Sequence, residues 1–116
     1  MKILHTADWH LGTFRSPVKD GVNLRTEDTK RCLDELIRVA NEEKPDYSLV
    51  SGDIFHVGRL WSDRCCEEII TAIHYIRELA AVSKQVVVMR GTPNHDGSGQ
   101  FNVLSEMFAD VPNVHV

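Results

Sequence analysis

The amino-acid sequence predicts an α/β fold in which a largely parallel sheet carries helices on its faces. Short apolar runs end abruptly at polar or glycine residues, as β-strands do, and the longer stretches between them repeat their apolar positions with helical spacing. The two patterns alternate in the order β-α-β-α-β-α-β, which favours parallel strand pairing. Ligands of such sheets bind beyond the carboxyl ends of the strands, so we expect the functional residues to follow strands.

The expected strands are short apolar runs, and the third contains a continuous apolar run, which predicts burial on both of its faces. They lie at residues 2–6, 47–51, 84–89 and 113–116. The expected helices lie at residues 26–43, 62–81 and 101–108. Thr26 and Ser62 are the expected N-caps of the first two helices, and Pro45 ends the first. Residues 7–25 and 90–99 are expected to be loops, and a loop as long as the first usually carries function.

Length and composition predict one compact domain. The chain has 116 residues, of which 42% are hydrophobic, as in ordinary globular proteins. Its net charge of −4 is opposite to that of a basic nucleic-acid-binding module. If the chain acts on DNA, metal ions, local basic patches or a partner must help to hold it. Cys32, Cys65 and Cys66 lack the spacing of a zinc ribbon or a disulfide framework, and we expect reduced thiols in the cytoplasm. No apolar run approaches the ~20 residues of a membrane span, so we expect no membrane association.

Side chains that commonly bind metal ions follow the first two expected strands. Asp8 and His10 follow the first strand, and Gly52 with Asp53 follows the second. A carboxylate and an imidazole two residues apart can converge on one ion, and the pair suits manganese, iron or zinc better than magnesium. Gly52 allows the backbone to turn tightly enough to aim the Asp53 carboxylate over the sheet, where its two oxygens could bridge two ions.

A third polar group, Asn94-His95-Asp96, follows the third expected strand. Asn94 offers a neutral carbonyl oxygen to a second ion. His95 is a candidate to donate a proton or a hydrogen bond to a reacting phosphate, and Asp96 could orient or charge-stabilise its imidazole. Each motif taken alone is also what an ordinary polar turn looks like. Their occurrence in order, at three successive strand ends, favours a shared metal site.

Together these motifs resemble the calcineurin-like metallophosphoesterase superfamily, whose pattern is D-x-H, then G-D, then N-H-D. The opening KILHTADWHLG, followed by SGDIFH, is similar to the start of SbcD-type DNA exonuclease subunits, and the resemblance covers essentially the whole chain. It implies a layered metallophosphoesterase-type sheet, two divalent ions with Mn²⁺ favoured, DNA as substrate, an SbcC-type ATPase partner and a homodimer of the full-length protein. It also implies that residues 1–116 are the N-terminal part of a nuclease domain that acts in double-strand-break repair.

The resemblance also implies roles for individual residues. Asp8 and His10 would bind the first ion, and Asp53 would bridge both ions. Asn94 would bind the second ion. His95 would contact the scissile phosphate, with the aspartate that follows it supporting its imidazole.

Three features depart from the family pattern. Two residues separate Gly91 from Asn94, which alters the approach of the third loop. His56 stands where SbcD-type relatives often carry aspartate; we expect a surface loop residue, with a substrate-side or extra metal contact as the alternative. The family needs a further histidine and a G-H-x-H segment after the third motif, whereas this sequence has only His115 after Asp96, which we expect to be structural. We therefore expect only the first half of the full domain, with a half site that binds metal weakly and hydrolyses poorly.

Several other residues attract attention because of their chemistry. We expect His5 to be hydrogen-bonded in or beside the first strand, and His74 to lie on a helix surface. Trp9 is expected to pack and hold the first loop, with stacking on a nucleobase as the alternative. Arg15 and Arg25 make the first loop locally basic, and they could contact a DNA backbone as readily as solvent.

Three functions compete for this sequence. The first is a manganese-dependent DNA exonuclease/endonuclease subunit. The second is a small-molecule phosphodiesterase or phosphatase of the same superfamily, against which the SbcD-like opening argues. The third is a non-catalytic role, as a truncated paralogue or a partner-binding fragment, and the missing histidines favour it for these 116 residues.

Overall fold

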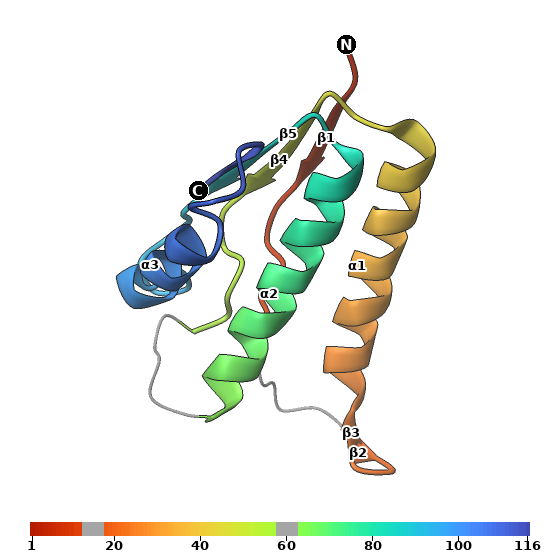
Figure 1. Cartoon of the computed structure of the whole chain (residues 1–116). Coiled ribbons are helices and arrows are strands. Elements are labelled where there is room, and N and C mark those ends of the chain that lie inside the picture. Colours follow the sequence, from red (N-terminus) through yellow and green to blue (C-terminus); the bar gives the residue numbers. More distant parts are fainter. Residues whose placement is uncertain (13–17, 58–62) are drawn as a thin grey trace.

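A computed structural model of the chain confirms the alternation of strands and helices (Figure 1). It describes residues 1–12, 18–57 and 63–116. The main sheet contains β1 (Ile3–Thr6), β4 (Tyr47–Ser51), β5 (Gln85–Met89) and β6 (Val114–His115). The helices are α1 (Leu24–Glu43), α2 (Asp63–Val82) and α3 (Ser98–Met107). The strands lie in the order β1-β4-β5-β6 and every neighbouring pair is parallel, as the sequence predicted.

Burial alternates along the central strands, so helices cover one face of the sheet. The buried positions of β4 and β5 are Ser48, Val50, Val86 and Val88. α1 and α2 lie side by side along the sheet (Figure 1). The intervening positions are more open, and Tyr47 and Met89 are 38% and 57% exposed. The expectation that the 84–89 strand is buried on both faces is therefore wrong for the described residues. An apolar strand does not by itself reveal how many layers cover it.

The hydrophobic core lies between the sheet and the helices. Ile76 and Leu79 of α2 and Leu104 of α3 are fully buried there. Ile54 and Phe55, which follow β4, belong to the same core and are also fully buried. The segment beyond the end of β4 is therefore anchored by apolar side chains.

A short antiparallel hairpin occupies part of the expected 7–25 loop. It pairs β2 (Val18–Lys19) with β3 (Val22–Asn23). The two residues between the strands, Asp20 and Gly21, have φ of 55° and 79°. Two successive left-handed residues make the tight turn that Asp-Gly favours in hairpins, so this part of the loop expectation is corrected.

α1 begins two residues before its expected start because Asn23, and not Thr26, is its N-cap. The Asn23 side-chain oxygen accepts hydrogen bonds from the N–H groups of Arg25 (3.0 Å) and Thr26 (3.2 Å). These bonds satisfy backbone donors that have no partner within the first turn of a helix. The helix ends at a left-handed Lys44, with φ of 48°, directly before Pro45 as expected.

α3 begins at Ser98, three residues before its expected start. The Gln100 side chain accepts the N–H of Gly97 at 2.9 Å and donates to the carbonyl of Val57 at 2.9 Å. One buried side chain thus caps the helix and ties it to the segment after β4. The expected N-cap of the second helix, Ser62, lies outside the described residues. No helix in the described part of the chain is long and apolar enough to cross a membrane.

Tyr75 of α2 contacts α1 through its hydroxyl group. The ring is 6% exposed, and the hydroxyl donates to the carboxylate of Asp34 at 2.7 Å. We predict that Tyr75→Phe keeps the packing but lowers the free energy of unfolding by about 1 kcal/mol, because one interhelical hydrogen bond is lost. Tyr47→Phe is the matched control, since Tyr47 is 38% exposed, and should cost less than about 0.5 kcal/mol. Equal effects in urea denaturation would contradict this role.

The carboxyl group of Glu68 in α2 should make the stability of the fold depend on pH. Burial, with the charge of Glu67 as a smaller cause, raises the pKa of the Glu68 carboxyl from 4.5 to about 7. A raised folded-state pKa contributes stability below the unfolded value, and that contribution is lost as pH rises through the folded value. Glu68→Gln should therefore raise the melting temperature at about pH 8 and change it little at about pH 4. Glu106→Gln, on the exposed side of α3, should show no such pH-dependent gain; the same small change at both pH values in Glu68→Gln would refute the prediction.

Candidate metal centre

The segments that follow β1 and β4 stay hydrogen-bonded to each other beyond the ends of the strands. The N–H of Asp8 donates to the carbonyl of Gly52, and the N–H of His10 donates to the carbonyl of Asp53, both at 3.0 Å. The N–H of Leu11 donates to the carbonyl of Ile54, so the pairing continues into the segment after Asp53. The first two sequence motifs therefore lie side by side at the carboxyl edge of the sheet, where they were expected.

Unusual backbone angles concentrate in these two segments. Asp8, His10 and Asp53 have φ of 56°, 47° and 50°, and Gly52 has φ of 85°. The left-handed conformation costs a non-glycine residue roughly 1–2 kcal/mol. Such residues persist where the surrounding structure imposes them, and they cluster at functional sites. Five non-glycine residues in the described part of the chain have a positive φ, and three of them are predicted metal ligands.

Asp8, His10 and Asp53 form a group that could hold a metal ion. One ligand atom from each lies within 4.8 Å of the other two. The side chains of Asp8 and His10 are 67% and 31% exposed, so an ion can reach them from solvent. Two carboxylates and one imidazole are donors that suit manganese, iron or zinc. The residues present therefore fit a divalent ion, and their role as ligands remains a prediction.

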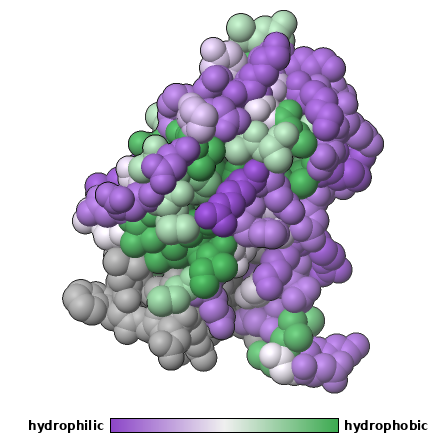
Figure 2. Space-filling view, in the orientation of Figure 1, coloured by the Kyte–Doolittle hydropathy of each residue, from purple (hydrophilic) through white to green (hydrophobic). Residues whose placement is uncertain are grey.

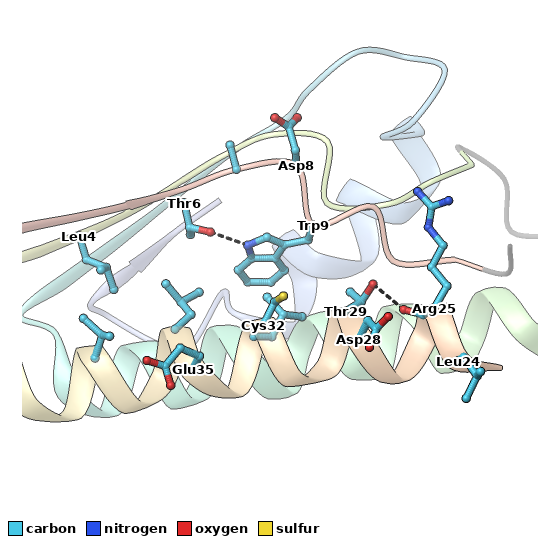
Figure 3. Close-up of a pocket in the computed structure, with 14 residues that line it drawn as sticks. Leu4, Thr6, Asp8, Trp9, Leu24, Arg25, Asp28, Thr29, Cys32 and Glu35 are labelled. Carbon is cyan, nitrogen blue, oxygen red and sulfur yellow. Dashed lines mark hydrogen bonds between the residues drawn. The ribbon is translucent and has the colours of Figure 1, made fainter. Parts of the chain in front are cut away.

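Trp9 lies between two predicted ligands in the sequence but points away from them. Figure 3 shows the Asp8 carboxylate and the Trp9 indole leaving the turn in opposite directions. The indole is 5% exposed, and its Nε1–H donates to the hydroxyl of Thr6 at 2.8 Å. It lines a groove between β1 and α1 that Arg25 also lines (Figure 3). Trp9 therefore packs and holds the turn, as expected.

The third loop closes tightly on Asp53. A Cβ added to Gly52 would lie 2.7 Å from the Cα of Gly91, and a Cβ added to Gly91 would lie 2.2 Å from the backbone nitrogen and Oδ1 of Asp53. The N–H of Thr92 donates to Oδ1 of Asp53 at 2.8 Å, and the Thr92 hydroxyl lies 3.2 Å from the same oxygen. The backbone hydrogen bond from Thr92 is the main cause that lowers the pKa of Asp53, against an opposing effect of desolvation. The carboxylate is therefore ionised at neutral pH and suited to a cation.

Asp96 is the buried anchor of the third loop. It is fully buried, its Oδ1 accepts the N–H of Phe55 at 3.0 Å, and its Oδ2 accepts the N–H of Gly91 at 2.7 Å. The Nδ1 of His95 bonds instead to the carbonyl of His56, at 2.7 Å. The expectation that Asp96 orients the imidazole is thus corrected for Nδ1, whose partner is the carbonyl of His56, and charge stabilisation by Asp96 remains a prediction. Asp96 supports the loop that carries His95.

His56 joins the centre from the segment after β4. Its N–H donates to the carbonyl of Leu11 at 2.9 Å. Its ring centroid lies 5.8 Å from that of His10 and 5.9 Å from that of His95, and the His10 and His95 centroids are 4.6 Å apart. Burial lowers the pKa of His56, and the neighbouring His10 and His95 lower it further, which favours a neutral ring. Its expected place as a surface loop residue is corrected: it lies beside the predicted ligands.

The remaining candidate residues are spread over the chain. Asn94 is exposed in the turn before His95, and its role as a ligand remains a prediction. Arg15 lies outside the described residues, so its contact with substrate also remains a prediction. Three other histidines pair with side chains away from the centre, which confirms their expected structural roles. They are His5, His74 and His115.

The face of the molecule seen in Figure 2 is mixed in character, with hydrophobic residues gathered between hydrophilic ones.

Two residues that shape the centre were missed by the sequence analysis. Thr92 holds the Asp53 carboxylate, and its place directly after Gly91 at a strand end was an available signal, because successive N–H groups in a turn often bind anions. Gly12 leaves room for His56, since a Cβ at Gly12 would lie 2.6 Å from the Cβ of His56. No local sequence pattern indicates the contact between Gly12 and His56, because it joins segments far apart in the sequence.

Comparison with known proteins agrees with the geometry. Residues 1–115 match the calcineurin-like phosphoesterase family. The chain belongs to this family. Its members are metal-dependent phosphoesterases, which is the class that the motifs and the ligand group predicted.

Named relatives of the chain include bacterial nuclease subunits. The SbcD subunit of nuclease SbcCD from Staphylococcus epidermidis is 30% identical over 108 residues, and the protein of the same name from Staphylococcus saprophyticus is 31% identical over 108 residues. Each alignment covers 93% of this chain and 26% of the relative. The chain therefore spans about a quarter of the length of the curated relatives it matches.

The anchoring role of Asp96 can be tested by stability. Asp96→Asn replaces one acceptor oxygen with an NH₂ donor, so the N–H of either Phe55 or Gly91 loses its buried partner. We predict a loss of about 2 kcal/mol in the free energy of unfolding. Asp110→Asn, at an exposed position, is the control and should cost less than about 0.5 kcal/mol. If the two variants unfold at the same denaturant concentration, Asp96 is not the anchor of this loop.

Proposed function

We propose that this chain carries the first half of the two-metal active site of an SbcD-type DNA nuclease subunit. In this role, an exonuclease/endonuclease hydrolyses phosphodiester bonds during double-strand-break processing. The observation that supports the proposal most strongly is the convergence of Asp8, His10 and Asp53, with His95 beside His10. The predicted ligands and the imidazole that is proposed to contact phosphate therefore lie at the same edge of the sheet.

The ligand set favours two divalent ions, with Mn²⁺ as the first choice. Asp8 and His10 would hold one ion, Asp53 would contribute to both, and Asn94 would hold the second. Bound divalent ions activate water and stabilise negative charge on a phosphate. Thr92 binds Oδ1 of Asp53, and Oδ2 accepts neither of the Thr92 hydrogen bonds.

His95 is proposed to act on the phosphate. A carbonyl oxygen only accepts hydrogen bonds, so the contact with the carbonyl of His56 places the proton of His95 on Nδ1. In the neutral ring Nε2 then carries the lone pair, and protonation there would make it a donor to a phosphate oxygen. The Asp96 anchor holds the loop in place while this happens.

The substrate and partners are proposed from the relatives. Two of them are named as the SbcD subunit of nuclease SbcCD, which favours DNA as substrate and an SbcC-type ATPase as partner. We also propose a homodimer for the full-length protein. The net charge of −4 means that backbone contacts to DNA would depend on bound cations and on partner surfaces.

Substitution of Asp53 tests the metal site. Asp53→Asn keeps the size of the side chain and removes the charge that attracts cations. We predict at least about a tenfold loss of Mn²⁺ affinity by titration calorimetry, since even residues behind the ligands contribute that much to metal binding. We also predict loss of any Mn²⁺-dependent cleavage. Asp110→Asn, on an exposed turn, should bind Mn²⁺ as the native chain does. Equal Mn²⁺ affinity in Asp53→Asn and the native chain would end the proposal.

The choice of substrate separates the three candidate functions. DNA with free ends and a small phosphodiester are offered to the native chain in Mn²⁺. Preferential cleavage of DNA supports the nuclease assignment, and cleavage of the small diester alone would refute it. Mn²⁺ binding without cleavage of either substrate is the result expected of a half site, and it would favour the non-catalytic role for these 116 residues taken alone.

A further inference from the structure

Three imidazoles meet at the carboxyl edge of the sheet, and the proposed two-metal site uses only part of this group. His10 follows β1, His56 follows β4 and His95 follows β5. One ring nitrogen from each lies within 4.8 Å of the other two. All three side chains are partly buried, so the group is neither sealed in the core nor spread over the surface.

The position of His56 is imposed by the backbone around it. Its N–H donates to the carbonyl of Leu11, which fixes the residue against the segment after β1. Its Cβ packs directly on Gly12, where an added Cβ would lie only 2.6 Å away. Ring atoms Cγ and Cδ2 of His56 lie over the same glycine, 3.4 and 3.6 Å from the added Cβ, so His56 is held near His10 by the path of the chain.

The hydrogen bond of His95 prepares its ring to bind a cation. Nδ1 of His95 donates to the carbonyl of His56 at 2.7 Å. The neutral ring therefore presents the lone pair of Nε2. Histidines that bind metals in proteins are usually oriented in this way, with one ring nitrogen donating to a carbonyl or carboxylate. The acceptor here belongs to another member of the group, so His56 and His95 hold each other in place.

The donor set determines which ions such a group would select. Three neutral nitrogens suit Zn²⁺, Co²⁺, Ni²⁺ or Cu²⁺, whereas Mg²⁺ and Mn²⁺ favour oxygen donors. Three protein ligands with one open position are also the pattern of zinc sites that bind water or substrate. We infer that His10, His56 and His95 form an all-nitrogen site for a borderline divalent ion of the Zn²⁺ class. This goes beyond the proposed function, which assigns His95 to the phosphate and gives His56 no metal.

The two ligand groups share His10, and this has a consequence for ion binding. An ion bound by the three imidazoles would occupy His10, so His10 could not also bind an ion held by Asp8 and Asp53. Zn²⁺ and Mn²⁺ therefore compete, even though the rest of their ligands differ. The existence of the three-histidine site does not depend on catalysis by the carboxylate group, so each proposal can fail without the other.

Cobalt titration tests the site directly. The full chain is titrated with Co²⁺, whose tetrahedral complexes absorb visible light strongly, and Zn²⁺ is then added to displace it. His56→Ala and His56→Gln should each weaken Co²⁺ binding at least about tenfold and remove the tetrahedral band. Asp53→Asn should keep the band, and His74→Ala, which alters an exposed histidine of α2, should match the native chain. Thermal melts without metal establish that each variant is folded.

The native chain supplies a second measurement that needs no substitution. Its six histidines divide into three in the group and three controls, His5, His74 and His115. On addition of Zn²⁺, the ring ¹⁵N resonances of His10, His56 and His95 should shift together and those of the controls should stay in place.

Two results would overturn the inference. One is native-like Co²⁺ affinity in both His56 variants. The other is a Zn²⁺-induced shift of His10 alone, with loss of the Co²⁺ band in Asp53→Asn, which would place the ion on the carboxylates. A native chain that binds Co²⁺ through its imidazoles, together with equal Mn²⁺ affinity in the native chain and Asp53→Asn, would support this inference and count against the proposed function alone.

Discussion

The metal centre depends on backbone hydrogen bonds that continue between the segments after β1 and β4. Segments leaving a sheet usually separate as their backbone angles become irregular. Here left-handed angles at Asp8, His10 and Asp53 turn each segment while the N–H to carbonyl pairing continues. Burial of Ile54 and Phe55 in the core opposes the cost of these angles, because the paired segment cannot relax without exposing two large apolar side chains. The separation of the ligands is thereby set by the backbone, before any ion binds.

Three aspartates at this edge differ in what their surroundings allow them to do. Asp96 is fully buried and each of its oxygens accepts a backbone N–H, so it is closed to an ion from solvent and serves as an anchor. Asp53 has one oxygen held by Thr92, which aims the carboxylate and keeps it ionised. The side chain of Asp8 is largely exposed, so its carboxylate is open to an ion from solvent. Burial thus separates an anchoring carboxylate from two that can bind a cation, although all three have the same chemistry in the sequence.

The strand ends, the helix order and the convergence of Asp8, His10 and Asp53 could be predicted because parallel strands deliver their carboxyl ends to one edge. The hairpin and the Asn23 cap were missed although their local signals were present, an Asp-Gly turn and an asparagine before a helical stretch. His56 is a different case. Its place depends on a backbone bond to Leu11 and on the absence of a side chain at the neighbouring glycine, and both contacts join distant parts of the chain. Periodicity and spacing carry no information about such contacts.

The shared histidine gives the choice of metal a chemical consequence. An ion bound by Asp8, His10 and Asp53 neutralises both carboxylates and leaves His95 as an imidazole beside the phosphate position. An ion bound by His10, His56 and His95 would do the reverse, because it would engage the imidazole proposed to contact phosphate and leave the two carboxylates without a directly bound ion. The all-nitrogen arrangement would thus occupy both His10 and His95, so a borderline ion held there would act as a competitor of Mn²⁺ and not as its substitute.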